Sequence, residues 1–200
     1  MPHFDLRADS KAPARAAPRR PAILYFHTDR ASAGRALSEG EFRLTPTSQG
    51  EPVMRSPESM QILPFGLRKS IAGAGFLTLG LSTGFQQESR PPGVTDCCIA
   101  IRNTEEFGER LHRAVQRALP QWAGIDAAVA YGAPSPLGAA FTKSLHLSWQ
   151  QEWLFAWRPM QPTFSLRSMV VQIGSIEAIA KLRAANNVSK NDGDIANETV

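Results

Sequence analysis

The stretch that decides the fold is "ILYFHTDRASAGRALSEGEFRLT", residues 23–45. Its apolar and aromatic start predicts a buried strand over residues 22–26. Asp29 is a suitable N-cap for a short helix over residues 30–38, in which small apolar residues recur at helical spacing. The alternating residues 41–45 then predict a second strand. The ordered part of the chain is therefore expected to open with a strand, a helix and a strand.

Two polar side chains, His27 and Thr28, stand where the first predicted strand meets the loop before the helix. Polar residues in such places either satisfy the local backbone or bind a ligand. Thr28 can cap a local turn, and a single histidine at the end of a strand is commonly a half-buried structural residue. The pattern alone leaves both interpretations open.

The composition is that of a globular chain. It has 200 residues, of which 42% are hydrophobic and 20% are charged, enough for one core. No apolar run reaches the roughly 20 residues that span a bilayer. No apolar secretory signal follows the polar N-terminus. We therefore expect a cytoplasmic protein with no membrane-spanning segment.

The net charge of +4 is unevenly distributed along the chain. Residues 1–21 are rich in alanine, proline and arginine, which predicts a disordered basic leader. Residues 185–200 are polar and lack periodicity, which predicts a disordered tail. A single α+β domain is therefore expected over residues 22–184. Within it, residues 45–70 carry four prolines and predict a long irregular segment.

The rest of the domain predicts more strands than helices. Further strands are expected in five stretches: 75–85, 95–103, part of 124–132, 149–157 and 167–175. The clearest helix starts at Asn103, which forms a capping-box pattern with Glu106, and it ends before Pro120. His112 lies at the edge of its apolar stripe and is expected to be structural. A last helix is expected over residues 175–184. This order predicts a mixed, largely antiparallel sheet with flanking helices.

Sequence patterns for several common chemistries are absent. The chain has no phosphate-binding Gly-x4-Gly-Lys loop, no Gly-x-Ser-x-Gly elbow and no His-Glu-x-x-His motif. Cys97 and Cys98 are adjacent, so on a strand their side chains point to opposite faces. Neither a disulfide nor a metal site is therefore expected.

One constellation of polar residues remains. Gln150 and Glu152 are two apart on the predicted strand 149–157, and they therefore share one face. Ser82 and Thr83 stand at the end of another predicted strand. These residues form either a binding site or the solvent-facing side of strands whose other side carries buried aromatic residues.

At these residues the chain resembles the ADP-ribosyltransferases, the fold of diphtheria-type and cholera-type toxins and their relatives. The resemblance lies in "YFHTDRASAGRALSEGEFRLT", "FLTLGLSTGF", "CCIAI", "VAYG" and "FTKSLHLSWQQEWLF". These lines are also similar to a bacterial family of unknown function that is commonly placed beside these folds. The resemblance implies an ADP-ribosyltransferase-like fold, with NAD as the donor of ADP-ribose.

The resemblance implies a role in cofactor binding for four residues. His27 is similar to the histidine that holds the cofactor ribose, and Thr28 is its polar neighbour. Ser82 and Thr83 are similar to the start of the middle-strand element that shapes the nicotinamide pocket. The chain departs from that element at the third position, where Gly84 replaces a serine.

The same resemblance implies that Glu152 is the catalytic acid and that Gln150 orients the acceptor. Breaking the bond between nicotinamide and ribose builds positive charge on the sugar, which a nearby carboxylate stabilises. The acceptor is a protein side chain or a nucleic-acid base, and the pattern does not decide between them. Aromatic contact with nicotinamide would come from Phe76, Phe85 or a tryptophan. Lys143 either contacts phosphate or is solvated.

Two other functions also fit the sequence. The alternative is a non-enzymatic interaction protein of a phage or mobile element, which binds a protein partner. Its binding surface would be the Pro-rich segment 45–70, exposed tryptophans and the basic leader. The third function is nucleic-acid binding through Arg15, Arg19 and Arg20, with an affinity that falls steeply with salt. Loss of NAD turnover on Glu152→Ala separates the enzyme from both.

Overall fold

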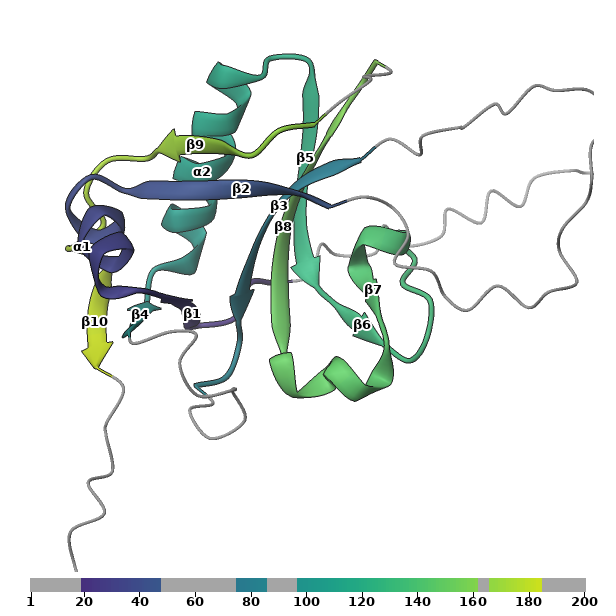
Figure 1. Cartoon of the computed structure of the whole chain (residues 1–200), viewed down its shortest axis with the longest axis horizontal. Coiled ribbons are helices and arrows are strands. Elements are labelled where there is room, and N and C mark those ends of the chain that lie inside the picture. The colour runs from purple at the N-terminus through teal and green to yellow at the C-terminus, as the bar shows by residue number, and fades with distance from the viewer. Residues whose placement is uncertain (1–18, 48–74, 86–96, 162–165, 185–200) are drawn as a thin grey trace, which may run out of the picture.

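The computed structural model describes residues 19–47, 75–85, 97–161 and 166–184 (Figure 1). The described residues form an α+β fold built on a largely antiparallel sheet, as the sequence predicts. Most of the predicted leader, most of the segment 45–70 and the predicted tail lie outside the described residues. No helix of the described part is long and apolar enough to cross a membrane.

The first three elements follow the sequence prediction closely. They are β1 (Leu24–Thr28), α1 (Arg30–Ser38) and β2 (Glu41–Thr47). Asp29 caps α1 by accepting a hydrogen bond of 2.9 Å from a backbone N–H of the first helical turn. Gly40 follows the C-cap with a φ of +67°, a conformation that glycine adopts without strain.

The remaining elements are mostly short strands around one long helix. They are β3 (Phe76–Ser82), β4 (Cys97–Ile101), α2 (Thr104–Ala118), β5 (Trp122–Ala128), β6 (Ala130–Tyr131), η2 (Ala139–Phe141), β7 (Thr142–Lys143), η3 (Leu145–Gln150), β8 (Glu152–Pro159), β9 (Met169–Gln172) and β10 (Ala180–Ala184). Asn103 caps α2 by accepting a 3.2 Å hydrogen bond from the Glu106 backbone N–H, as expected.

The sheet divides at β3. On one side of β3 lie β8 and then β5, which is the outer strand among the described residues. On its other side β3 pairs with two strands. Residues 76–78 pair with β2, which continues to β9, and Ser82 pairs with Tyr25 of β1, which continues to β4 and β10. The strands β1, β3 and β8 are therefore neighbours, although the chain separates them widely.

The main core lies on the face of the sheet that α1 and α2 cover (Figure 1). Its largest fully buried side chains include Phe42, Phe107, Phe155 and Trp157. Each such side chain contributes roughly 2–3 kcal/mol through the apolar surface that it removes from water. A smaller cluster lies on the opposite face, where the η2 residue Phe141 packs on strands β3, β5 and β8.

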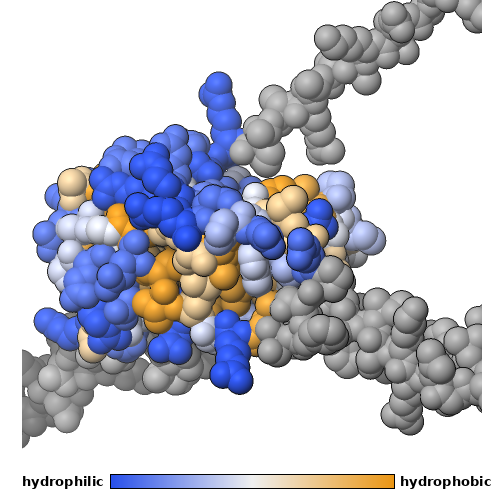
Figure 2. Space-filling view, turned by 90° about the horizontal axis from the view of Figure 1, so that it is seen from above, coloured by the Kyte–Doolittle hydropathy of each residue, from blue (hydrophilic) through white to orange (hydrophobic). Residues whose placement is uncertain are grey.

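Some large apolar side chains remain at the surface. Seen from above, a strip of apolar residues crosses a surface that is otherwise mainly hydrophilic (Figure 2). Among the described residues, the large hydrophobic ones that are more than a third exposed are Phe85, Ile125, Leu137, Leu145, Met160, Val170 and Leu182. Two of them, Ile125 and Leu137, lie beside the same cavity.

The predicted last helix over residues 175–184 is wrong. Ile176 and Ile179 are both buried, and their i, i+3 spacing imitates the apolar face of a helix. They lie instead in a turn that leads into β10, which pairs along its whole length with β4. Pairing with an open strand edge has therefore overridden the local pattern, which is a weak guide for short segments.

Candidate functional site

The structure brings three of the predicted site residues to one face of the sheet. Tyr25 pairs with Ser82, and Ser82 pairs with Glu152 across β1, β3 and β8. Paired residues point to the same face, and so do alternate residues along one strand. His27 is two residues beyond Tyr25, and it therefore faces the same way. Residues that alternate with them along the strands, among them Phe26, Leu81 and Trp153, face the main core on the other side.

Two rows of paired residues extend this face across five strands. The longer row is Lys181, Ala100, Tyr25, Ser82 and Glu152, and the shorter row is Arg183, Cys98 and His27. At the usual spacing between strands, the longer row spans about 19 Å. Exposed cationic side chains stand at the β10 end, and a carboxylate stands at the β8 end.

Glu152 is a largely buried carboxylate in a close ion pair. Its side chain is 15% exposed, and Oε2 lies 2.5 Å from Nζ of Lys143. Oε2 accepts no hydrogen bond from the described residues, so the ion pair alone compensates its charge. The carboxylate occupies the space above Gly80, where a Cβ would stand 2.0 Å from Oε1. Lys143, which the sequence left as either a phosphate contact or a solvated residue, is therefore held beside Glu152 while 32% of its side chain stays exposed.

Tyr131 lies beside this carboxylate. Its hydroxyl oxygen accepts a 3.0 Å hydrogen bond from the backbone N–H of Glu152. Burial raises the pKa of Tyr131, and the negative charge of Glu152 raises it further. The phenol therefore stays protonated near neutral pH, which leaves its proton available to an acceptor in the site.

Gln150 does not share a strand with Glu152, contrary to the prediction. It is the last residue of η3, and Gln151 turns the chain with a φ of +42° before β8 begins. This left-handed turn ends the pattern of alternating faces on which the prediction rested. Gln150 is nevertheless connected to the carboxylate, because its Oε1 accepts a 3.1 Å hydrogen bond from Nζ of Lys143.

The other residues predicted to bind the cofactor take part in strand pairing or in hydrogen bonds within the fold. His27 and Thr28 belong to β1 and do not follow it as predicted, because pairing with β4 continues to the end of the strand. The His27 ring nitrogen Nε2 lies 3.9 Å from Sγ of Cys98. The hydroxyl of Thr83 donates a 3.0 Å hydrogen bond to the backbone carbonyl of Gln151.

An aromatic pair adjoins these residues. The rings of Tyr25 and Phe85 lie 5.6 Å apart between centroids. The guanidinium of Arg183 lies 5.4 Å from the centroid of Phe85, within the range of a cation–π interaction. Phe85 is one of the residues from which the sequence predicts an aromatic contribution.

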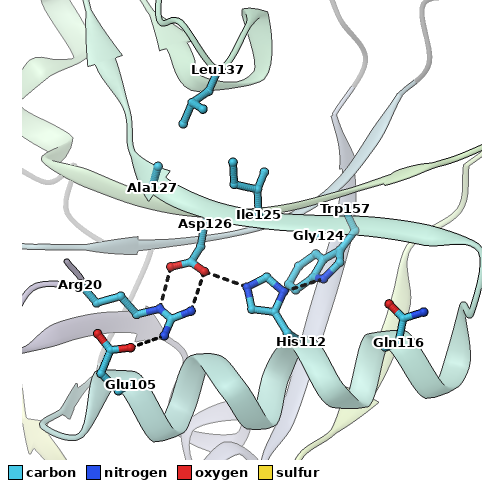
Figure 3. Close-up of a pocket in the computed structure, with 10 residues that line it drawn as sticks. All are labelled: Arg20, Glu105, His112, Gln116, Gly124, Ile125, Asp126, Ala127, Leu137 and Trp157. Atoms are coloured by element: carbon cyan, nitrogen blue, oxygen red, sulfur yellow. Dashed lines mark hydrogen bonds and ion pairs between the residues drawn. The ribbon is translucent and has the colours of Figure 1, made fainter. Parts of the chain in front are cut away.

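A second polar cluster, which sequence reasoning did not find, lies on the α2 side of the sheet. The carboxylate of Asp126 accepts two hydrogen bonds from Arg20 and one from Nε2 of His112, all of 2.7–2.8 Å (Figure 3). It accepts a fourth, of 2.9 Å, from the indole N–H of Trp153. Burial alone would raise the pKa of Asp126, but these hydrogen bonds outweigh burial and hold that pKa well below its usual range.

His112 is a neutral structural residue in this cluster, in agreement with the sequence prediction. Its Nδ1 accepts a 3.1 Å hydrogen bond from the indole N–H of Trp157. The ring proton therefore belongs on Nε2, which donates to Asp126. Both ring nitrogens are thus occupied, and the imidazole has no nitrogen left to take a proton from a substrate.

Arg20 belongs to the folded body, although it lies in the predicted leader. Besides Asp126 it contacts Glu105 of α2, at 2.5 Å from Nη1. The hydrogen bond with Asp126 raises the pKa of Arg20. No sequence pattern near Arg20 predicts a contact with a residue 106 positions away. Arg20 is therefore not available as the phosphate contact that the nucleic-acid hypothesis requires.

An open cavity of about 490 Å³ adjoins the Asp126 cluster. It runs along the outer edge of β5, between α2 on one side and Leu137 on the other (Figure 3). None of the residues predicted to bind NAD or to act in catalysis lines it. The cavity and the candidate site are therefore separate features of the molecule.

Gly124 on β5 has no room for a side chain. A Cβ at this position would stand 2.6 Å from the indole of Trp157 and 2.7 Å from Nδ1 of His112. We expect Gly124→Ala to lower the free energy of unfolding by about 1–3 kcal/mol through overpacking, measured by urea denaturation. Gly34→Ala is the control, because no atom lies within 4 Å of its Cβ position. Equal stability of the two variants would contradict this account of the packing.

No protein-family model matches the chain, and no curated protein and no solved structure is significantly similar to it. The described residues also contain no group of three or more potential ligands that could hold a metal ion.

Proposed function

We propose that the chain is an ADP-ribosyltransferase that binds NAD on the face carrying His27, Ser82 and Glu152. The observation that supports this most strongly is the strand register, which places these residues on one face of three adjacent strands. Glu152 would stabilise the reacting ribose, and Ser82 beside it would contact the nicotinamide. His27, one strand away from Ser82, would hold the ribose, whereas Thr28 follows it in β1 and faces the other side of the sheet, contrary to the role predicted for it.

The environment of Glu152 suits a carboxylate that stabilises positive charge. When nicotinamide leaves, the ribose acquires oxocarbenium character, and a carboxylate held beside it lowers the energy of that state. The ion pair with Lys143 and the space above Gly80 hold the Glu152 side chain in one orientation. Gln150 is bound to the same lysine, and in this proposal it orients the acceptor.

The charges and rings along this face suit a dinucleotide. NAD carries a negatively charged diphosphate between two ribose groups. Lys181 and Arg183 stand at the end of the rows remote from Glu152, where they would attract the diphosphate. Tyr25 and Phe85 lie between the two ends and provide aromatic surface for stacking.

The alternative function is a non-enzymatic protein that binds its partner through exposed tryptophans, the Pro-rich segment and the basic leader. The tryptophans do not fit this function, because none of the four is fully exposed. Trp153 and Trp157 are buried in the core, and Trp122 and Trp149 are half-buried. The leader and the Pro-rich segment lie almost entirely outside the described residues. The described residues that the sequence assigned to this alternative do not favour it over the enzyme.

The experiment that tests the proposal uses the full chain and two forms of labelled NAD. One form carries its label in the nicotinamide ring, and the other carries it in the adenylate. We expect release of labelled nicotinamide, with transfer of the adenylate label to a protein or nucleic-acid acceptor added in separate reactions. Neither release nor binding of NAD, where a known transferase works, would contradict the proposal.

Gly80 offers a change that disturbs the carboxylate and spares the fold. In Gly80→Ala the new Cβ would overlap Oε1 of Glu152, whose flexible end has to turn away. We expect nicotinamide release to fall by about tenfold or more, because catalysis depends on the position of the carboxylate. Thermal unfolding of the variant should stay close to that of the wild type. An unchanged rate of nicotinamide release would show that catalysis does not depend on where the Glu152 carboxylate lies.

A further inference from the structure

One hydrogen-bonding edge of the outer strand β5 has no strand partner within the described part of the chain. Among the described residues β5 pairs with β8 alone. Residues of an antiparallel strand alternate between those whose backbone groups face the partner and those whose groups face away. The backbone N–H of Val129 and the carbonyl of Gln121 bond to the β8 side, at 3.0 and 2.9 Å. The register therefore directs the N–H and C=O groups of Gly124, Asp126 and Ala128 outward.

This edge forms one wall of the cavity beside the Asp126 cluster. Residues 124–127 line the cavity, and Gln116 of α2 lies below them (Figure 3). On the other side of the strand, Ile125 and Leu137 point toward the cavity and are 42% and 40% exposed. The result is a groove with a helix on one side, apolar side chains on the other and unpaired backbone groups between them. We call it the β5 groove.

The charge of the β5 groove favours a basic occupant. Its lining carries two carboxylates, Asp126 and Glu105, and one guanidinium, that of Arg20. His112 is neutral, because its Nδ1 accepts a hydrogen bond and its proton lies on Nε2. The net charge of the lining is therefore −1. Glu105 is the exposed member, with 63% of its side chain accessible.

We propose that the β5 groove binds an extended peptide segment of a partner protein that adds to β5 as a further strand. Main-chain hydrogen bonds to Gly124 and Asp126 provide the affinity, as in other cases of strand addition to a sheet edge. Successive side chains of such a strand point in opposite directions. The segment therefore alternates aliphatic residues, which pack on Ile125 and Leu137, with basic residues, which face Glu105. This inference does not depend on the proposed transferase activity.

The test uses the full chain and a fluorescent peptide of alternating valine and lysine. Fluorescence anisotropy measures its binding against two matched peptides. One carries N-methyl groups on alternate amides, which removes backbone donors and keeps the side chains, and the other has glutamate in place of lysine. We expect both to bind at least about tenfold more weakly, because backbone hydrogen bonds and charge each contribute. Equal binding of the N-methylated peptide, or no binding of any peptide, would overturn the proposal.

Amide hydrogen exchange followed by NMR locates the bound peptide. Binding should slow the exchange of Gly124, Asp126 and Ala128, and Ile125→Lys should weaken the binding. Leu182→Lys is the matched control, because Leu182 is equally exposed on a different strand, β10. If these three amides already exchange slowly in the chain without peptide, a second copy or another segment of the chain occupies the edge. That result would overturn the proposal. An equal effect of the two substitutions would also overturn it.

Discussion

Replacement of Glu152 by glutamine is expected to slow nicotinamide release from NAD by at least about 100-fold, the usual effect of removing a group that stabilises a transition state. Glutamine keeps the size of the side chain and removes the negative charge that the developing oxocarbenium ion requires. Lys143 loses its charged partner, but it is 32% exposed and water can solvate it. The rate is measured with nicotinamide-labelled NAD, and folding is measured by thermal unfolding.

The matched control for this substitution is Glu177→Gln. Glu177 is an exposed glutamate in the turn before β10, away from the rows of paired residues. Its replacement should leave the rate unchanged. A Glu152→Gln variant that keeps both its fold and its rate would show that Glu152 is not the catalytic carboxylate.

Asp126→Ala is expected to lower the free energy of unfolding by about 3–5 kcal/mol, as for the loss of one partner from a buried ion pair. The substitution removes the acceptor of four hydrogen bonds and leaves Arg20, His112 and Trp153 without it. Only 8% of the Asp126 side chain is exposed, so water cannot replace the lost acceptor. Urea denaturation at neutral pH measures the effect. A loss below about 1 kcal/mol, typical of a surface ion pair, would contradict this account.

The contribution of Asp126 should also depend on pH in a defined direction. Its pKa is lower in the folded chain than in the unfolded chain, where it lies near its usual value of about 3.9. The unfolded state therefore binds more protons at acid pH, and stability rises with pH. The contribution is fully present above about pH 5 and is lost as the pH falls toward the folded-state pKa. Urea denaturation of the wild type and Asp126→Asn should show a stability difference that shrinks on acidification, and a difference that grows would be incompatible with a lowered pKa.

The elements predicted correctly are those with local signals. Asp29 and Gly40 mark the two ends of α1, and Asn103 with Pro120 marks the limits of α2. Caps and helix breakers act through hydrogen bonds and backbone conformations within a few residues. The alternation in 41–45 likewise lies within β2. The boundaries of the helices and strands in these stretches can therefore be predicted from the sequence.

The features that sequence reasoning misses depend on partners far away in the chain or on an unusual backbone conformation. Residues 175–184 have apolar residues at helical spacing, but the first of them form a turn and the last five pair with the open edge of β4 as β10. Arg20 and Asp126 meet because residues 20 and 21, just before β1, contact the first turn of α2 and the strand β5, which no local pattern predicts. The prediction misplaces Gln150 because one residue, Gln151, takes a left-handed conformation that glutamine rarely adopts.

The candidate site is predictable in its residue types and only partly in its geometry. The sequence alone does not determine that Ser82 and Glu152 are direct cross-strand partners, because the register depends on how β3 and β8 meet. It also does not reveal that Lys143 reaches back to the carboxylate. Both features follow from strand pairing and from the path of the chain between β6 and β8.

The most direct measurement of the central claim is a crystal structure of the full chain with bound NAD. We predict that the nicotinamide riboside lies over Gly80 and Ser82, with the ribose within hydrogen-bond distance of Glu152. The diphosphate should lie toward Lys181 and Arg183. NAD bound elsewhere, such as in the cavity beside β5, or crystals without NAD at saturating concentration, would contradict the claim.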